Sequence, residues 1–289
     1  MTYRSVFRPG LFEGEIVIVT GAGSGIGRCT AHELAALGAT VVLIGRKAEK
    51  LEAVAAEITE DGGEADIAVC DIRVEETVRD TIAKILARHG PVRHLVNNAG
   101  GQFQALLEDT SQKGWEAVVQ TNLTGGFLMS RELYTQSMKA SGGGIVNILA
   151  DFWMSMPRMG HSGAARAGML NFTETAALEW GPDGVRVNAV APGWVISSGF
   201  DTYDPEYTKR FRILHNYAPL GRLGEEAEIS AAIAFLLSPA AGYITGSCLR
   251  VDGGVPNARN YHEMSEGPGT EPFQGFHRAV VPKALTDPE

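Results

Sequence analysis

A glycine-rich turn has the composition and the surroundings of a phosphate-binding site. Its sequence is Thr20-Gly21-Ala22-Gly23-Ser24-Gly25-Ile26-Gly27. It follows a short apolar run at 16–19 and leads into a helical pattern at 28–37, so it joins a buried strand to a helix. The glycines permit a tight turn and a close backbone approach to a pyrophosphate, and the helix N-terminus attracts the anion. We expect a dinucleotide to bind here through Gly21, Ser24, Gly25, Ile26 and Gly27.

Strand-like and helix-like patterns alternate along the chain around that turn. The expected strands cover residues 16–19, 40–44, 65–70, 94–97, 145–149, 185–190 and 248–251. The expected helices cover residues 28–37, 51–58, 78–86, 115–138, 162–180 and 225–237. Continuous apolar strands that alternate with helices indicate a parallel sheet covered on both faces. The pattern therefore predicts an α/β fold with a seven-stranded parallel sheet.

Length and composition favour one domain with a short segment at each end. The chain has 289 residues, of which 44% are hydrophobic and 20% charged, enough for one α/β domain with a sizeable core. We expect residues 1–13 to form an N-terminal extension and residues 14–254 to form the domain. Residues 255–289 are rich in glycine, proline and charge and lack periodicity, which predicts a C-terminal tail or surface arm.

The overall charge points to a small ligand. The formal net charge is -9, which argues against a surface for nucleic acid or for an anionic membrane. The longest apolar stretch, at 231–237, is too short to span a bilayer. Cys29, Cys70 and Cys248 lie far apart in apolar patterns, which fits reduced thiols in a cytosolic protein, and no Cys/His spacing of a metal site is present.

A second motif, Asn97-Asn98-Ala99-Gly100, follows the fourth expected strand. Together with the glycine turn it makes the chain resemble the short-chain dehydrogenase/reductase family over about residues 14–254. Further family-like segments are Asn122 in Gln-Thr-Asn-Leu, Arg186-Val187-Asn188, Ala191-Pro192-Gly193, Ile244-Thr245-Gly246 and Val251-Asp252-Gly253-Gly254. The resemblance implies one doubly wound Rossmann-type domain, hydride transfer with a nicotinamide cofactor at the carboxyl ends of the strands, and a homotetramer.

The resemblance also implies which residues surround the cofactor. Those expected on the adenosine side are Asn97, Ala99 and Gly100, with Asp71 and Ile72 at the adenine edge. Those expected at the nicotinamide carboxamide are Pro192, Gly193, Val195 and Ser197. The alternative for Pro192-Gly193 is an ordinary turn after a strand.

The end of the second expected strand indicates the type of cofactor. An NAD site needs a carboxylate there for the ribose 2′-hydroxyl, and that carboxylate repels a 2′-phosphate. This chain has Gly45 at that place, followed by Arg46 and Lys47. A guanidinium pairs bidentately with phosphate, which favours NADP(H). The alternative is that Arg46 only begins a solvated helix end.

The usual reactive residues of the resembled family are replaced. That family uses a serine after the fifth strand, then a tyrosine, and a lysine four residues later. Counted back from Thr173 and Glu179, these positions hold Ala150, Ser162 and Arg166. A serine hydroxyl is a poor acid near neutral pH and arginine does not lose its proton, so ordinary alcohol or ketone chemistry lacks its usual acid.

The segment His161-Ser162-Gly163-Ala164-Ala165-Arg166-Ala167-Gly168 resembles the enoyl-CoA reductase branch of the family. That branch includes peroxisomal trans-2-enoyl-CoA reductase and the 2,4-dienoyl-CoA reductases, which also have a serine at the tyrosine position. Conjugate reduction places charge on a thioester enolate, which hydrogen-bond donors stabilise without a strong acid. We expect Ser162 and Asn122 to be those donors, and Arg166 to hold the ribose hydroxyls.

Several residues near this segment keep two interpretations. Ser162 has an alternative as the N-cap of the helix it begins. His161 and Asp151 receive no catalytic role from the sequence. The apolar cluster of Phe152, Trp153, Met154, Met156 and Met159 fits an acyl pocket or simple core packing.

We therefore predict an NADPH-dependent reductase of the conjugated double bond in an enoyl-CoA or dienoyl-CoA thioester. One alternative is an NAD(P)-dependent dehydrogenase of a branched or terpenoid alcohol or of an aldehyde, with its acid from Tyr203, Tyr207 or Tyr217. Another is a cofactor-binding protein without catalysis. Arg4, Arg8, Lys209, Arg210 and Arg212 are candidates to bind the CoA phosphates. The last residues, Asp287-Pro288-Glu289, form no peroxisomal signal, so the cytoplasm is the expected location.

Overall fold

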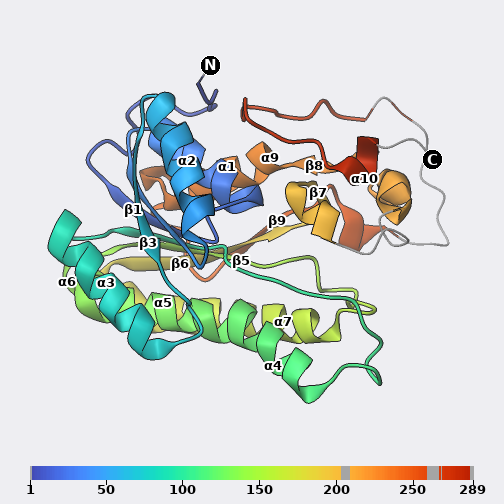
Figure 1. Cartoon of the computed structure of the whole chain (residues 1–289), viewed down its shortest axis with the longest axis horizontal. Coiled ribbons are helices and arrows are strands. Elements are labelled where there is room, and N and C mark those ends of the chain that lie inside the picture. Colours follow the sequence, from blue (N-terminus) through green and yellow to red (C-terminus); the bar gives the residue numbers. More distant parts are fainter. Residues whose placement is uncertain (1, 203–208, 259–266, 268, 287–289) are drawn as a thin grey trace.

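The computed structural model describes residues 2–202, 209–258, 267 and 269–286 and is built around a parallel sheet (Figure 1). The sheet has seven strands in the order β3-β2-β1-β4-β5-β6-β9. They are β1 (Ile16–Thr20), β2 (Thr40–Gly45), β3 (Glu64–Val69), β4 (His94–Asn97), β5 (Gly143–Ile148), β6 (Val185–Pro192) and β9 (Cys248–Val251). All neighbouring pairs are parallel, so the predicted seven-stranded sheet is confirmed.

Helices cover both faces of the sheet, as the alternating pattern predicts (Figure 1). One layer holds α1 (Gly25–Ala36), α2 (Ala48–Glu60) and α9 (Glu226–Leu237). The opposite layer holds α3 (Glu75–His89), α4 (Gln112–Val119), α5 (Gly125–Leu133), α6 (Lys139–Ser141) and α7 (Gly160–Trp180). This doubly wound arrangement confirms the predicted fold class.

The two layers bury two separate sets of apolar side chains. Leu34, Leu51 and Ile233 belong to the core between the sheet and α1, α2 and α9. Val78, Met129 and Trp180 belong to the core on the opposite face. Each fully buried aliphatic side chain stabilises the fold by about 1.5–3 kcal/mol relative to an exposed one. These cores hold the carboxyl ends of the strands at one edge of the sheet.

Shorter segments complete the described chain. Two π-helical turns, η1 (Gln120–Thr124) and η2 (Tyr134–Met138), interrupt the region that the sequence predicts as one helix over 115–138. The 3₁₀ segments are η3 (Gly181–Asp183), η4 (Ser198–Thr202), η5 (Lys209–Tyr217), η6 (Pro239–Ala241) and η7 (Val255–Asn257). A small two-stranded sheet of β7 (Val195–Ile196) and β8 (Gly224–Glu225) and the helix α10 (Lys283–Thr286) lie toward the C-terminal part of the chain.

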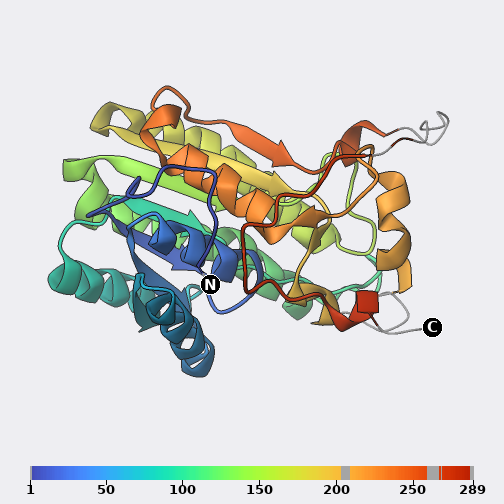
Figure 2. The same cartoon turned by 90° about the horizontal axis from the view of Figure 1, so that it is seen from above.

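The two end segments pack against each other and against the domain. The amide of Arg4 donates a hydrogen bond of 2.9 Å to the carbonyl of Gly275. Tyr3 and Phe276 are buried beside Cys29 of α1 and Ala227 of α9. Figure 2 shows the C-terminal segment in red as it passes over α9 toward the blue N-terminal region.

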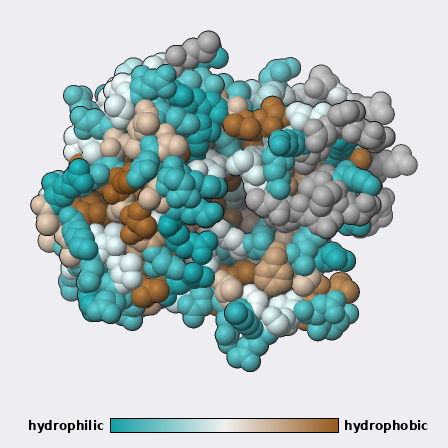
Figure 3. Space-filling model, in the orientation of Figure 1, coloured by the Kyte–Doolittle hydropathy of each residue, from teal (hydrophilic) through white to brown (hydrophobic). Residues whose placement is uncertain are grey.

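The face of the molecule shown in Figure 3 is mostly hydrophilic, with separate small hydrophobic patches. Among the described residues, no helix is both long and apolar enough to cross a membrane.

Candidate active site

The glycine turn between β1 and α1 has a backbone that other residues cannot adopt without strain. Gly21 and Gly25 have φ angles of +66° and +60°. A Cβ atom on Gly21 would lie 2.8 Å from Cα of Ala99, and one on Gly27 would lie 2.5 Å from the carbonyl oxygen of Gly21. The turn is therefore compact, and the first amides of α1 face the anion-binding side.

A cleft of about 400 Å³ opens along this turn. Its lining includes Gly21, Ser24, Ile26, Arg46, Asp71, Ile72, Ala99 and Gly100 from the set that the sequence assigns to the cofactor. Gly25 and Gly27 shape the turn from within α1 rather than line the cleft. The cleft thus joins the carboxyl ends of β1, β2, β3 and β4.

Basic side chains gather at the β2 end of this cleft. They are Arg46, Lys47, Lys50 and Arg73. Arg73 donates hydrogen bonds to both carboxylate oxygens of Asp71, at 2.8 and 2.5 Å. These bonds hold the pKa of Asp71 below its usual range, although partial burial acts against them. The cleft therefore has a cationic end that suits a phosphate.

Two of the predicted adenosine residues serve mainly to hold the backbone. Nδ2 of Asn97 donates to Oδ1 of Asn147 and to the hydroxyl of Ser130, each at 2.8 Å, and this ties β4 to β5 and α5. The amide of Ala99 donates to the hydroxyl of Thr20 at 3.0 Å. Both contacts fix the strand ends beside the glycine turn.

A second cavity of about 450 Å³ adjoins the cleft. Ile26 and Ser197 line both, so the two spaces meet at these residues. Pro192, Gly193 and Val195 also line the second cavity, which places the predicted nicotinamide residues where the two spaces join. A dinucleotide along the cleft would have its far end at this cavity.

The walls of the second cavity combine apolar and charged groups. The apolar side chains include Met156, Met159, Trp194, Phe200, Phe211 and Leu214. The polar ones include Gln102, Asp151, Ser155, Arg158 and Arg210. Phe152 and Trp153 stack on each other at 4.4 Å and do not line this cavity, and Met154 is exposed. Of the predicted apolar cluster, only Met156 and Met159 contribute to the wall.

Two residues of the cavity wall have an unusual backbone. Ser155 and Arg158 have φ angles of +71° and +65°, and they are the non-glycine residues with positive φ in the part of the chain that the structure describes. Such conformations cost about 1–3 kcal/mol each and are concentrated at functional sites. The sequence holds no signal for them, because neither residue type favours this region.

Ser162 lies behind Gln102, away from the open cavity. It is fully buried inside α7, and its hydroxyl donates a hydrogen bond of 2.8 Å to Oε1 of Gln102. The N-cap of α7 is Met159, so the alternative of Ser162 as a helix cap is wrong. His161 accepts a hydrogen bond from the Ser162 amide at Nδ1, and its ring contacts that of Phe103 in a tilted arrangement. Burial lowers the pKa of His161.

Asn122 holds the residue next to Gln102. It lies in the π-helical turn η1 and is buried. Its Nδ2 donates to the carbonyl of Gly101 and its Oδ1 accepts the Gly101 amide, both at 2.9 Å. Asn122 and Ser162 therefore bind neighbouring residues of one loop, Gly101 and Gln102.

Arg166 is a buried cation beside the same loop. Its Nη1 donates a hydrogen bond of 2.5 Å to the carbonyl of Ile148, and its Nε has no hydrogen-bond partner. A Cβ on Gly100 would lie 2.5 Å from Nη2 of Arg166, so only glycine leaves room there. Burial lowers the pKa of Arg166 to about 10, which still leaves it charged at neutral pH. The guanidinium thus has one protein acceptor, for Nη1, and places Nη2 beside Gly100, which fits a group with donors left for ribose hydroxyls.

Sequence reasoning did not assign Gln102, Asp151 or Arg158 to the site. Gln102 is not among the residues that the sequence singles out, and Asp151 receives no catalytic role from it. Of the tyrosines proposed as an alternative acid, Tyr203 and Tyr207 lie outside the described residues. Tyr217 is about half exposed and is not part of the cavity wall.

Comparison with known proteins agrees with this arrangement. A family model described as enoyl-(acyl carrier protein) reductase matches residues 21–256. The probable 2,4-dienoyl-CoA reductase of Bacillus subtilis (strain 168) is 37% identical over 245 residues, which cover 84% of this chain and 96% of the relative.

Two solved structures have the same fold, one at higher and one at lower sequence identity than that relative. The citronellol catabolism dehydrogenase AtuB of Pseudomonas aeruginosa PAO1 is 58% identical, with a TM-score of 0.80 over 88% of this chain and 99% of that one. The actinorhodin polyketide ketoreductase with NADPH is 31% identical, with a TM-score of 0.80 over 87% of this chain and 100% of that one.

The names of these relatives include different substrates, whereas the fold and the glycine turn are common to the family. The family match covers most of the chain, and it includes the turn, the cleft and the cavity described above. The predicted resemblance is therefore confirmed: the chain is an oxidoreductase of the short-chain dehydrogenase/reductase family, which binds a nicotinamide cofactor.

Proposed function

We propose that this protein is an NADPH-dependent reductase of the conjugated double bond in an enoyl-CoA or dienoyl-CoA thioester. The observation that supports it most directly is the hydrogen bond from Ser162 to Gln102. Ser162 is the residue that the sequence predicts at the position of the family's usual tyrosine. This pair offers hydrogen bonds but no strong acid. Conjugate reduction needs stabilisation of an enolate oxygen rather than a proton at that oxygen, so it suits this site.

In this reaction we assign a role to each of four residues of the chain. When bound, the reduced nicotinamide supplies the hydride for the β-carbon of the thioester. The Gln102 carboxamide lines the cavity and would donate its N–H to the thioester oxygen as negative charge develops there. Ser162 orients and polarises that carboxamide by donating to its oxygen, and Asn122 fixes Gly101 beside it. In this proposal Ser162 and Asn122 are positioning residues, and Arg166 holds the ribose.

The preference for NADP(H) rests on the cationic end of the cleft. Arg46, Lys47 and Lys50 line it, and Asp71 is neutralised by Arg73. Among the described residues that line the cleft, Asp71 is the only one with a carboxylate, and its ion pair with Arg73 reduces the repulsion of a 2′-phosphate. A guanidinium at Arg46 can bind the 2′-phosphate bidentately.

The choice of a thioester rests on the second cavity. Its apolar side chains suit an acyl chain, and Arg158 and Arg210 at its wall suit an anionic group of the same molecule. The relative from Bacillus subtilis whose name includes 2,4-dienoyl-CoA supports this class. The homotetramer stays a prediction from the family resemblance, and the cytoplasmic location stays a prediction from the sequence.

A second candidate is a dehydrogenase of a branched or terpenoid alcohol or aldehyde. The observation that favours it is the 58% identity with the citronellol catabolism dehydrogenase AtuB of Pseudomonas aeruginosa PAO1. The same apolar cavity would accept such a chain. This reaction requires a group that exchanges a proton with the substrate oxygen.

A substrate panel separates the two candidates. Purified protein is mixed with NADPH or NADH and a series of trans-2-enoyl-CoA and 2,4-dienoyl-CoA thioesters, and with NADP⁺ or NAD⁺ and citronellol or other free alcohols. The proposal predicts loss of NADPH absorbance with thioesters. Turnover of free alcohols without turnover of any thioester would select the second candidate instead.

A further inference from the structure

Either reaction must move one proton, and the replaced tyrosine can no longer do so. Among the described residues that line the second cavity, Asp151 is the one side chain that can exchange a proton between about pH 4 and 8. Arg158 and Arg210 keep their protons, and the serine hydroxyls are too weakly acidic. Asp151 is therefore the first candidate for this step.

Asp151 lies in the wall of the second cavity, beside residues predicted to bind the nicotinamide. It lies three residues after the end of β5 and directly follows Ala150, the residue that the sequence predicts at the position of the family's usual serine. The amide of Asp151 donates a hydrogen bond of 3.2 Å to the carbonyl of Pro192, the residue before Gly193. Asp151, Pro192 and Gly193 all line the second cavity.

The surroundings of Asp151 favour its protonated form. Its Oδ1 is buried and has no hydrogen-bond partner. Burial raises the pKa of Asp151, and the nearby Asp252 raises it further, against a backbone hydrogen bond from Trp153 and the charge of Arg250. A raised pKa lets a carboxyl keep a proton that it can then donate near neutral pH.

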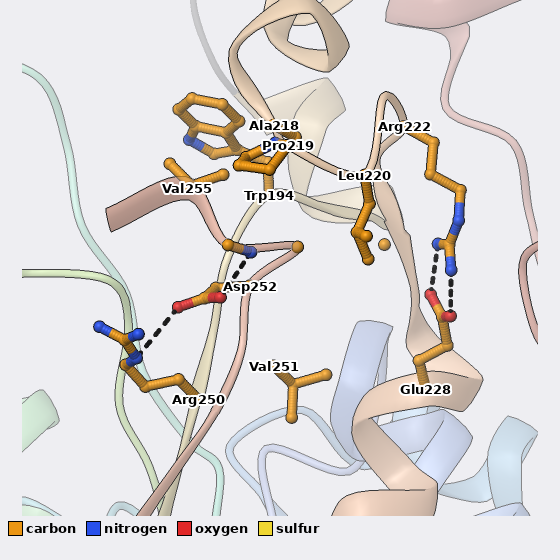
Figure 4. Close-up of a pocket in the computed structure, with 13 residues that line it drawn as sticks. Trp194, Ala218, Pro219, Leu220, Arg222, Glu228, Arg250, Val251, Asp252 and Val255 are labelled. Carbon is orange, nitrogen blue, oxygen red and sulfur yellow. Dashed lines mark hydrogen bonds and ion pairs between the residues drawn. The ribbon is translucent and has the colours of Figure 1, made fainter. Parts of the chain in front are cut away.

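The neighbouring carboxylate of Asp252 also has a buried oxygen without a hydrogen-bond partner, Oδ2, but that oxygen forms an ion pair. Asp252 accepts a hydrogen bond of 2.9 Å from the Gly254 amide, and its Oδ2 lies 3.6 Å from Nε of Arg250. Figure 4 shows the carboxylate of Asp252 beside Arg250, in a neighbouring pocket of about 410 Å³ that shares Trp194 with the second cavity. Arg250 also lies 5.6 Å above the ring of Trp153. Of the two carboxyl groups, only Asp151 is part of the wall of the second cavity.

We propose that Asp151 is the general acid of this site and gives the proton to the α-carbon of the reduced thioester. The inference rests on the proposed function for the identity of that carbon. As hydride reaches the β-carbon, the double bond shifts to form the enolate. The O–H bond of Asp151 then breaks, a C–H bond forms at the α-carbon, and the thioester carbonyl is restored. Water returns the proton to the carboxylate.

The charged groups around Asp151 determine how its proton depends on pH. Arg250 of β9 and Asp252 directly after that strand act on Asp151, and Arg158 and Arg210 share its cavity. Reduction requires the acid form, so kcat/KM should fall as the pH rises through the pKa of Asp151. Asp252→Asn removes the negative neighbour and leaves Arg250, so it should move this decline to lower pH.

The test compares Asp151→Asn with Asp252→Asn and with Asp80→Asn, an exposed control on α3. Each variant is assayed from pH 5 to 9 with a thioester that the unmodified protein reduces, and NADPH binding is measured by fluorescence titration. Asp151→Asn should lower kcat by about 10²–10⁴-fold and abolish the pH-dependent decline, with NADPH affinity unchanged. Asp80→Asn should match the unmodified protein.

The inference is overturned if Asp151→Asn keeps its kcat or keeps the same decline with pH. It is also overturned if Tyr203→Phe or Tyr207→Phe abolishes that decline while Asp151→Asn does not. If the unmodified protein reduces no thioester and oxidises free alcohols instead, the proposed function fails. The same variants then test Asp151 as the base for the alcohol, and activity should fall as the pH decreases.

Discussion

The hydroxyl of Ser162 donates a hydrogen bond of 2.8 Å to Oε1 of Gln102, and this contact joins α7 to the loop after β4. Ser162 is fully buried, whereas Gln102 lines the second cavity. The serine at the position of the family's tyrosine therefore reaches the substrate space through a neighbour. In the proposed function we therefore expect Gln102, rather than Ser162, to contact the thioester.

A double-mutant cycle on this pair tests the relationship. Removal of one oxyanion donor costs about 10²–10³-fold in kcat, and Gln102→Ala should lose this amount. Ser162→Ala should lose less, because the carboxamide remains but is no longer oriented. Since Ser162 acts through Gln102, the double variant should be no slower than Gln102→Ala alone. Additive losses in kcat would mean that Ser162 contacts the substrate by itself.

Replacement of Arg166 should separate stability from cofactor binding. Arg166 is buried with one carbonyl partner, and no carboxylate pairs with it among the described contacts. Removal of a buried unpaired charge stabilises a protein, so Arg166→Met should raise the melting temperature without cofactor. It should also weaken NADPH binding, since the ribose loses its donor. Calorimetry and titration check both, and a lower melting temperature would show that the charge is compensated.

The fold was predictable because each element leaves a local pattern. A buried parallel strand such as β2 is a continuous apolar run, and the positive φ of Gly21 requires glycine in the sequence itself. The predicted start of α7 was less accurate. The helix begins at Gly160 rather than at Ser162, because its N-cap Met159 is not a residue type that usually caps helices. The π-helical turn around Asn122 also leaves no periodic mark, so a single helix was expected there.

The candidate site was predictable only in part, because its contacts join distant residues. Ser162 and Gln102 are 60 positions apart, and their hydrogen bond has no signature in either segment. The pKa of Asp151 depends on Asp252, which is about 100 positions away and follows β9. The sequence alone therefore assigned no role to Asp151. The strain at Ser155 and Arg158 comes from tertiary packing that overrides residue preference.

Arg46 should determine the choice between NADPH and NADH. A hydrogen bond to a charged group contributes about 1.5–3 kcal/mol, so Arg46→Ala should weaken NADPH binding by roughly 10- to 150-fold. NADH lacks the 2′-phosphate, and its affinity should stay the same. Arg79→Ala, an exposed change on α3, serves as the control for net charge. Equal losses for both cofactors would remove Arg46 from phosphate recognition.

Glu226 should make stability depend on pH. Burial raises its pKa from about 4.5 to about 7. Below pH 4.5 both folded and unfolded chains hold this proton, and between pH 4.5 and 7 the unfolded chain loses it first. Stability should therefore fall over this range, by on the order of 3 kcal/mol for this group. Glu226→Gln should remove that part of the decline and be more stable than the unmodified protein at pH 8, as measured by urea unfolding.

Phe276 tests whether the C-terminal segment is a loose tail or part of the packed structure. It is buried against Tyr3, His32 and Arg28, with a ring distance of 5.0 Å to His32. Phe276→Ala should lower the free energy of unfolding by about 3 kcal/mol, because it leaves a cavity. Val280→Ala, at an exposed position nearby in the chain, should have little effect. Equal stability of both variants would support the predicted domain of residues 14–254 as self-sufficient.

The position of a transferred deuterium tests the proposed reaction most directly. NADPH carrying deuterium at C4 of the nicotinamide is incubated with a trans-2-enoyl-CoA thioester, and the product is examined by mass spectrometry and NMR. We predict a saturated acyl-CoA with one deuterium at the β-carbon and a solvent proton at the α-carbon. Recovery of unreacted thioester, together with deuterium at the carbinol carbon of an alcohol formed from citronellal in a parallel sample, would contradict the proposal.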